Sequence, residues 1–435
     1  MTIVPQEQIV DNTPPLGFDF AQAVDVSGNT MVVGQRVVPN PNQLGGRALV
    51  YESLDGVWTL VQTLVPSDAE DFLRFGAFVA VDGDTMLVGA PFTGDFGIPT
   101  GPGAIYVFEH QGGTWVEVQK IQGNYEGFGQ QFALSGDRAI IHSVDSDGGL
   151  FTYQRVNGEW VVDQELVPTG FGPTRRFGGS FDIDGDRAVV SAFGSFKAII
   201  FDRIGGSWVE TARVNTDLFD ESGDSISFFG VVSLDGDVLA LGVPQSGTDH
   251  GAFNSGGVSM YRKVGSSWTH EADLSPSVLG MNNYFGGSIG LDGDLMVVGS
   301  DFFADDLFHS GAGFVFAYRD GSWQQVEMIV SPEPQFAGNF GDSVALNGSH
   351  MLVAAPGETV MTSFGVPGHG ALYPFNVVGP CPADLTGDMT LDFFDVARFL
   401  DLFAADDPAA DLTGDGLFDF FDVAAYLRLF SAGCP

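Results

Sequence analysis

A single pattern recurs seven times along this 435-residue chain, and it restricts the possible folds more than any other feature. Each copy has Phe-Gly or a close variant, then a turn dipeptide, and then an apolar segment that ends near Gly-Ala-Pro. The clearest copies begin at Arg74, Arg176 and Tyr284. The turn glycines lie 49 to 57 residues apart, at Gly28, Gly83, Gly136, Gly185, Gly236, Gly293 and Gly348. A period of this length is typical of repeat architectures, in which each copy is one structural unit.

Each unit carries the signals of four short strands. An Asp-Gly, Ser-Gly or Asn-Gly dipeptide between alternating apolar residues indicates a tight hairpin, because its central residues need positive φ. A third strand follows, such as the one from Gly103, and in six units a tryptophan opens a fourth. These tryptophans are Trp58, Trp115, Trp160, Trp208, Trp268 and Trp323. Four antiparallel strands per unit predict an all-β, seven-bladed β-propeller over residues 1–379.

The seventh unit has no such tryptophan and stops after its third strand, which starts near Ala371. Residues 2–10 precede the first copy of the repeat and have the apolar pattern of the other fourth strands. We therefore expect this N-terminal strand to complete blade seven, because joining the two ends closes the ring and removes exposed strand edges.

The repeat resembles the FG-GAP repeats of integrin α-subunit propellers and their bacterial relatives. The resemblance rests on Phe75-Gly76 with Gly89-Ala90-Pro91, and on looser versions in the other copies. Integrin-type blades often hold calcium in a D-x-D-x-D-G loop, whereas here the connection shrinks to Asp82-Gly83-Asp84. That turn is too short to wrap a cation with six or more oxygens, so no integrin-type calcium site is expected at these turns.

Charge and cysteine placement limit the partners and the compartment. Fifty-six acidic against 17 basic residues give a net charge of −39, which disfavours nucleic acid as a partner. No run of eighteen apolar residues occurs, so no membrane span is predicted. Cys381 and Cys434 bracket the C-terminal segment and predict one disulfide in an oxidising, extracellular or cell-surface location. No basic and apolar leader follows Met1, so this location is inferred from the other features.

Residues 380–435 contain a second, shorter duplication, whose copies begin at Asp384 and Asp411 and share fourteen of twenty positions. Each copy follows the plan of an EF-hand-like calcium loop, with oxygen ligands at positions 1, 3, 5, 7, 9 and 12, and then an amphipathic helix. The expected Ca²⁺ ligands are Asp384, Thr386, Asp388, Thr390, Asp392 and Asp395 in the first loop, and Asp411, Thr413, Asp415, Leu417, Asp419 and Asp422 in the second.

This duplication resembles the type I dockerin module. The resemblance implies two bound calcium ions and a cohesin-like or cell-surface anchor as partner. Threonine at position 3 removes a charge from each site, and Met389 replaces the usual turn glycine, which predicts a weaker first site. Loop positions 10 and 11, which help dockerins to recognise cohesin, hold diphenylalanines at Phe393-Phe394 and Phe420-Phe421. Each pair is either a docking patch or, for at least one ring, part of the small core.

The propeller sequence contains no established catalytic signature, and H-E-x-x-H does not occur in it. The loops between the second and third strands are long in blades two, five, six and seven, and long loops on a rigid scaffold are where binding residues concentrate. We expect the ligand face in the sector of blades five to seven, at Asp249, His250, Asp301, Phe302, Phe303, Asp305, Asp306, His309 and His369. The three histidines either form a metal or acid–base site or are solvated loop residues.

Two functions are therefore open. The first is a non-catalytic extracellular binding or scaffold protein, whose propeller engages a protein or glycan ligand and whose C-terminal module anchors it. The second is a secreted propeller enzyme, a hydrolase or lyase acting on polysaccharide, with the same module as its targeting device. Convergence of the loop carboxylates and histidines in one place favours the second function.

Overall fold

The fold is described from a computed structural model of the chain. The residues it describes are 1–12, 18–40, 43–54, 56–68, 74–91, 102–124, 127–143, 149–170, 177–192, 197–215, 230–246, 254–278, 283–303, 309–361, 367–378, 383, 385–386, 391, 393–405, 407, 410, 412 and 417–432. Two compact units are present: Gln6–Pro374 form one, and Met1–Pro5 with Phe375–Pro435 form the other. Each unit is described by itself.

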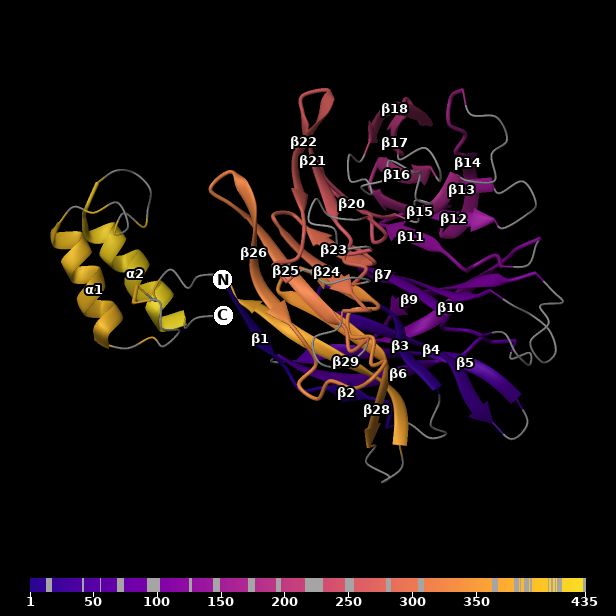
Figure 1. Ribbon diagram of the computed structural model, residues 1–435, viewed down its shortest axis with the longest axis horizontal. Coiled ribbons are helices and arrows are strands. Elements are labelled where there is room, and N and C mark those ends of the chain that lie inside the picture. The colour runs from indigo at the N-terminus through magenta and orange to yellow at the C-terminus, as the bar shows by residue number, and fades with distance from the viewer. Residues whose placement is uncertain are drawn as a thin grey trace. The chain divides into compact units, whose positions relative to one another are not determined.

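Seven antiparallel sheets follow one another along the chain, which confirms the seven-bladed β-propeller (Figure 1). Blade one comprises β3 (Phe18–Ser27), β4 (Thr30–Asn40), β5 (Gln43–Leu54) and β6 (Val57–Leu64). Blade two comprises β7 (Phe78–Asp82), β8 (Thr85–Ala90), β9 (Ala104–Gln111) and β10 (Thr114–Gln122). Blade three comprises β11 (Phe132–Ser135), β12 (Arg138–Ser143), β13 (Gly149–Val156) and β14 (Glu159–Glu165). Blade four comprises β15 (Phe177–Asp184), β16 (Arg187–Ala192), β17 (Lys197–Ile204) and β18 (Ser207–Asn215).

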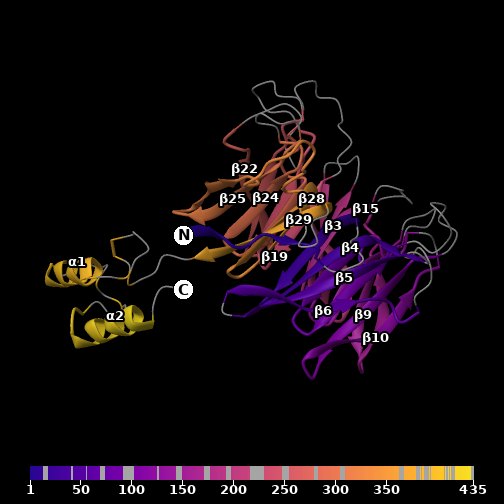
Figure 2. The same ribbon diagram turned by 90° about the horizontal axis from the view of Figure 1, so that it is seen from below.

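Blades five and six have the same four-stranded order. Blade five comprises β19 (Val231–Asp235), β20 (Val238–Gly242), β21 (Val258–Val264) and β22 (Ser267–Leu274). Blade six comprises β23 (Ser288–Asp292), β24 (Leu295–Ser300), β25 (Ala312–Arg319) and β26 (Ser322–Ile329). Each of the six tryptophans is the second residue of the fourth strand in its blade, as the sequence predicted. Figure 2 shows the strands of the first blades stacked side by side.

Blade seven is built from both ends of the repeat region. It comprises β27 (Val344–Asn347), β28 (His350–Met361) and β29 (Pro367–Val378). Two N-terminal strands, β1 (Thr2–Pro5) and β2 (Ile9–Val10), pair antiparallel with β29. Because β28 and β29 are long, only residues 362–366 separate them, so the dozen-residue loop expected in this blade is replaced by a long hairpin.

The Phe-Gly element of the repeat packs neighbouring blades against each other. Phe75 is fully buried, and its ring lies edge-on to Tyr106 at a centroid distance of 5.3 Å. Gly76 has φ +83°, and a Cβ there would lie 2.2 Å from the carbonyl oxygen of Arg47 in blade one. Phenylalanine therefore fills the space between two blades, and glycine alone allows the two backbones to approach so closely.

A ring of seven hydrogen bonds joins the hairpin turns of successive blades. In each blade the residue before the turn glycine accepts a hydrogen bond from the backbone N–H of the turn glycine in the next blade. Asp82 accepts from Gly136 at 2.6 Å, and Asn347 of blade seven accepts from Gly28 of blade one at 2.9 Å. The other acceptors are Ser27, Ser135, Asp184, Asp235 and Asp292. The residue before the glycine, whether Asp, Ser or Asn, therefore contacts the neighbouring blade as well as forming its own hairpin.

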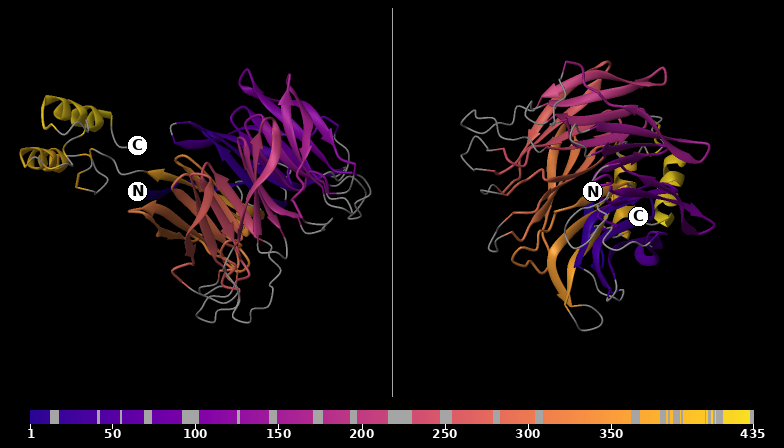
Figure 3. Two further views of the ribbon diagram at one scale, coloured as in Figure 1. Left: turned by 90° about the horizontal axis from the view of Figure 1, so that it is seen from above. Right: turned by 90° about the vertical axis from the view of Figure 1, so that its right-hand side faces the viewer.

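The C-terminal segment contains two helices, α1 (Phe393–Ala404) and α2 (Phe420–Ala432), which lie side by side (Figure 3). The Phe399 and Tyr426 rings are stacked, with centroids 4.1 Å apart, and both side chains are buried. Leu402, Ala383 and Ala410 complete the buried part of this small core. In the described part of the chain, neither helix is long and apolar enough to cross a membrane.

Candidate functional site

The predicted ligand face lies partly within the described residues. Asp301 and Phe302 form the turn after β24, and His309 lies shortly before β25. His369 is an exposed residue of β29. The remaining candidates, Asp249, His250, Asp305 and Asp306, lie outside the described residues.

A pair of acidic residues from blades six and seven marks this face. Desolvation raises the pKa of Asp301 to about 7, and the nearby negative charge of Asp342 raises it further. Burial also raises the pKa of Asp342, while the charge of Arg36 opposes that rise. Asn339 forms a side-chain hydrogen bond with Asp301. The Asp301 carboxyl is therefore partly protonated at neutral pH.

Aromatic rings stand beside the acidic pair. The ring of Phe302 lies between Tyr284 and His309, with centroid distances of 5.0 Å and 4.0 Å. Tyr284 and His309 both have positive φ, near 53° and 56°. Side chains that are not glycine rarely adopt this conformation, and it tends to persist where the surrounding structure imposes it. Here the backbone N–H of Asn339 donates to the carbonyl of His309 at 3.1 Å, which joins blade seven to the loop of blade six.

Phe303 is a core residue and does not belong to the ligand face. Its side chain is 2% exposed and packs edge-on against Phe314, with ring centroids 5.9 Å apart. Its carbonyl accepts a hydrogen bond from the Gly311 N–H at 3.0 Å. The prediction was wrong because a loop residue next to a strand end can turn inward, and periodicity does not reveal this.

Asp342 was missed by the sequence reasoning although a signal exists. It follows Phe340-Gly341, whereas the equivalent position is Ala77 in blade two and Gly287 in blade six. An acidic residue at that point of the repeat is a departure from the other copies.

The described residues contain no cluster of three or more His, Cys, Asp or Glu side chains suited to a metal ion. The histidines therefore give no sign of a metal site where the structure describes them.

The C-terminal loops bring together the described members of their expected ligand sets. In the first loop the Thr386 hydroxyl donates to Asp395 Oδ1 at 2.9 Å, and the Thr386 N–H donates to the same oxygen at 3.0 Å. In the second loop the Asp419 N–H donates to Asp422 Oδ2 at 3.0 Å. Asp395 and Asp422 are both fully buried, at the start of α1 and of α2.

The side-chain oxygens of these residues fit a calcium ion chemically. Each described group offers hard oxygen atoms, and each loop ends on a carboxylate that can bind in a bidentate manner. Leu417, whose carbonyl is the expected ligand at position 7, is also described. The other expected ligands lie outside the described residues: Asp384, Asp388, Thr390, Asp392, Asp411, Thr413 and Asp415. Cys381 and Cys434, the expected disulfide, lie outside them as well.

The two diphenylalanines are on the surface. Phe393 and Phe420 are each 75% exposed, and Phe394 and Phe421 are each 66% exposed. The rings within each pair have the same arrangement, with centroids 6.2 Å apart and planes at 68°. The alternative in which one ring of each pair belongs to the core is therefore wrong, because Phe399 and Tyr426 supply the large rings of that core.

Comparison with known proteins supports the repeat and the fold. Residues 58–108 and 268–316 match the FG-GAP repeat as a family, so the propeller contains FG-GAP repeats. No curated protein matches the sequence. A protein from Bacteroides uniformis described as a candidate 6-phosphogluconolactonase is similar in structure, with a TM-score of 0.51 and 11% identity over 78% of this chain and 94% of that chain. A protein from Lactobacillus plantarum has a TM-score of 0.50 and 12% identity over 80% of this chain and 99% of that chain. At such identities the fold alone is shared.

Proposed function

We propose that this chain is a non-catalytic extracellular binding or scaffold protein. Its propeller engages a protein or glycan ligand on the long-loop face, and its C-terminal module is dockerin-like, binds two Ca²⁺ ions and anchors the protein to a cohesin-like or cell-surface partner. A disulfide between Cys381 and Cys434 closes the module in this proposal.

The arrangement of the duplicated module is the observation that supports this proposal most. Asp395 and Asp422, the last ligands of the two calcium loops, are both buried and both contact an earlier residue of their own loop. Two exposed diphenylalanines with the same geometry then stand next to these carboxylates. Large exposed aromatic rings are typical anchors of protein interfaces, where they fill pockets on a partner.

Calcium titration of the full chain tests the anchoring module. We expect two binding events by calorimetry, the weaker at the loop that contains Met389. Asp422→Ala should remove the tighter event and Asp395→Ala the weaker, because each deletes a ligand that can bind in a bidentate manner. Asp407→Ala is the matched control, because this acidic residue lies between the two duplicated segments and outside the expected ligand sets. The absence of any calcium uptake by the unaltered chain contradicts the metal assignment.

Partner capture tests the docking role separately from calcium binding. The double substitutions Phe393→Ser with Phe394→Ser, and Phe420→Ser with Phe421→Ser, should abolish capture of a cell-wall or cohesin-like partner while calcium uptake persists. The exposed Leu427 of α2 is the matched control, and Leu427→Ser should retain capture. Capture unchanged in both diphenylalanine variants rules out this docking patch.

One observation favours the second candidate, a secreted hydrolase or lyase. Burial and the charge of Asp342 raise the pKa of Asp301 to about 7, which is the range that a general acid needs near neutral pH. An enzyme of this kind should lose polysaccharide turnover in Asp301→Asn while still binding the polysaccharide. If the chain is a binding protein, neither the unaltered protein nor Asp301→Asn should turn over polysaccharide, and the substitution should affect only ligand affinity.

A further inference from the structure

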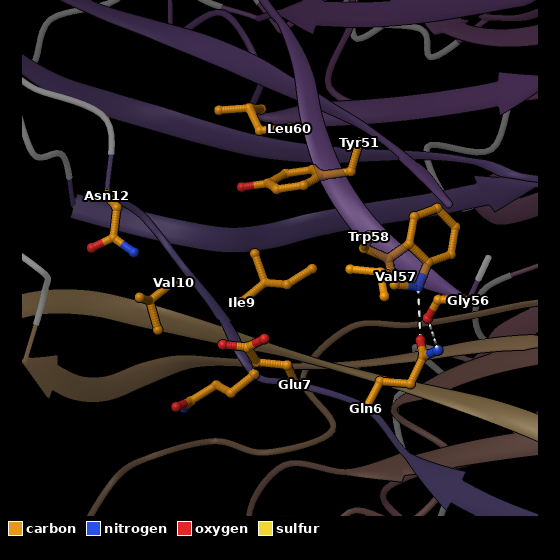
Figure 4. Close-up of a pocket in the computed structure, with 11 residues that line it drawn as sticks. Gln6, Glu7, Ile9, Val10, Asn12, Tyr51, Gly56, Val57, Trp58 and Leu60 are labelled. Atoms are coloured by element: carbon orange, nitrogen blue, oxygen red, sulfur yellow. Dashed lines mark hydrogen bonds between the residues drawn. The ribbon is translucent and has the colours of Figure 1, made fainter. Parts of the chain in front are cut away.

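A cleft of about 410 Å³ lies between the N-terminal segment and the outer hairpin of blade one (Figure 4). Residues 6–12 form one wall, and the end of β5 with the start of β6 forms the other. A volume of this size is within the range of pockets that hold small ligands or a few residues of a peptide. None of its lining residues belongs to the predicted ligand face, and it borders β6, the outermost strand of blade one.

The N-terminal wall of the cleft is held in place at three points. The indole N–H of Trp58 donates to Gln6 Oε1 at 2.9 Å, and Gln6 Nε2 donates to the carbonyl of Gly56 at 2.6 Å. Gln8 Nε2 donates to the Tyr373 hydroxyl at 2.6 Å. Farther along, the buried Asp11 carboxylate accepts hydrogen bonds from the guanidinium of Arg47. The wall is therefore fixed at Gln6, Gln8 and Asp11 before any ligand binds, which lowers the entropic cost of binding.

Glu7 stands between two of these anchors, Gln6 and Gln8. It is exposed, and none of the ion pairs among the described residues includes it. It is also the one charged side chain among the residues that line the cleft. A lone carboxylate in a chain of net charge −39 repels anionic ligands and attracts a cationic group.

The floor of the cleft is aliphatic. Val57 is 62% exposed and Leu60 is 38% exposed, and Ile9 of the N-terminal wall adds a third aliphatic side chain (Figure 4). The aromatic rings are already engaged: Tyr51 is 6% exposed, and the Trp58 ring packs edge-on against His350 at 4.9 Å. Among the described residues of the cleft, no exposed aromatic face is therefore available to stack on a sugar ring. Aliphatic side chains of a ligand suit this floor better than a sugar does.

The cleft also borders two strand edges. In the described sheets β6 pairs with β5 alone and β2 pairs with β29 alone, so each is the outermost strand of its blade. Unpaired backbone groups on an outer strand can accept a further strand, as in recognition by β-strand addition. An extended peptide meets this requirement and a folded surface does not.

We propose that the cleft binds an extended peptide segment in which aliphatic and basic residues alternate. The aliphatic side chains contact Val57 and Leu60, a basic side chain pairs with Glu7, and the peptide backbone pairs with the free edge of an outer strand. Side chains two residues apart in a strand point to the same side, so an alternating sequence presents one kind to the floor and the other to Glu7 and the solvent. This site is additional to the long-loop face and independent of calcium.

The probe for the test is a fluorescent nonapeptide of alternating valine and lysine, titrated with the full chain by fluorescence anisotropy. We expect saturable binding by the unaltered protein. Leu60→Lys should weaken binding by about tenfold, because it removes apolar contact and adds like charge to the floor. Glu7→Gln should weaken it by about threefold at low salt, the size of an exposed ion pair, and this difference should vanish in concentrated salt.

Val162→Lys is the matched control. Val162 occupies the position of β14 in blade three that Leu60 occupies in β6, two residues after the tryptophan, and it is also exposed. Binding by this variant should equal that of the unaltered protein. A valine–glutamate nonapeptide should not bind, and removal of calcium should change nothing.

Three results overturn the proposal. The first is no anisotropy change with the valine–lysine peptide. The second is unchanged affinity in Leu60→Lys while its thermal unfolding matches that of Val162→Lys. The third is displacement of the peptide by cellohexaose at an affinity that Glu7→Gln does not alter, which assigns the cleft to a neutral sugar. None of these results depends on the C-terminal module, so the proposed function stands or falls separately.

Discussion

At the scale of single residues, blade one contains a buried pair of opposite charges, which is costly to bury unless both charges stay paired. Arg47 and Asp11 form an ion pair of 2.7 Å, and both side chains are almost completely buried. Gln35 forms a hydrogen bond with each partner of this ion pair. Its side-chain amide donates to Asp11, and its side-chain carbonyl oxygen accepts from Arg47 Nε at 2.7 Å. This network attaches the N-terminal segment to the interior of the first blade.

Removing one member of this pair should destabilise the protein strongly. Asp11→Ala leaves the Arg47 guanidinium buried without its counterion, which costs about 3–5 kcal/mol in comparable cases. The free energy of unfolding, measured in urea, should fall by that amount. The double variant Asp11→Leu with Arg47→Met should recover part of the loss because no buried charge is left. If Asp11→Ala unfolds like the unaltered protein, the pair is not buried in solution.

Two other acidic residues make the stability depend on pH. Burial is the main cause that raises the pKa of Asp25 and of Asp182 to about 7, although each accepts two backbone hydrogen bonds that oppose the rise. In the unfolded chain these carboxyls lose their protons near pH 4, while the folded chain retains them until about pH 7. Their contribution to stability is therefore complete below pH 4 and is lost as the pH rises through 7.

The measurement is the free energy of unfolding of Asp25→Asn and Asp182→Asn between pH 4 and pH 8, relative to the unaltered protein. Each variant should gain on the unaltered protein as the pH rises, because it no longer has a carboxyl to ionise inside the fold. Asp320→Asn, at an exposed turn position, is the control and should run parallel to the unaltered protein. A difference that is constant with pH contradicts the raised pKa values.

At the scale of elements, the hairpin turn is the part of the repeat with two roles. Its glycine provides the positive φ that the turn needs, with φ +54° at Gly185 and Gly236. Its preceding residue accepts a hydrogen bond from the next blade, as Asp184 does from Gly236 at 2.8 Å. The same tight turn therefore joins two strands of its own blade and aligns the neighbouring blade.

Loss of one such hydrogen bond should be small but measurable. Asp184→Ala should lower the free energy of unfolding by about 1 kcal/mol, the typical net value of one intramolecular hydrogen bond. Asp184→Ser should retain most of the stability, because Ser135 already performs this role for Gly185 at 3.0 Å. Asp137→Ala, on the other side of a turn glycine, is the control. Equal losses in Asp184→Ser and Asp184→Ala argue against the bond.

At the scale of the whole molecule, the ring depends on its N-terminal strands. Thr2–Pro5 pair with residues 375–378, and Ile9 and Val10 pair with Leu372 and Ala371. Deleting residues 1–10 exposes the edge of β29 and removes the anchors Gln6 and Gln8. The thermal midpoint should fall sharply, and the truncated protein should aggregate because an unpaired edge accepts other strands. An unchanged midpoint excludes a role of these strands in stability.

The number of blades follows from the sequence by itself, because turn dipeptides, strand alternation and the tryptophans are local signals that each blade repeats. The oxygen ligands expected in the C-terminal loops are a local pattern too, since their spacing lies within twelve residues. What the tertiary structure decided depends on how blades stack. The acidic pair of Asp301 and Asp342, the inward turn of Phe303, and the cleft beside Glu7 all join residues from different strands or blades. Gln8 and Tyr373 are 365 positions apart and still form a hydrogen bond, a contact that only closure of the ring can produce.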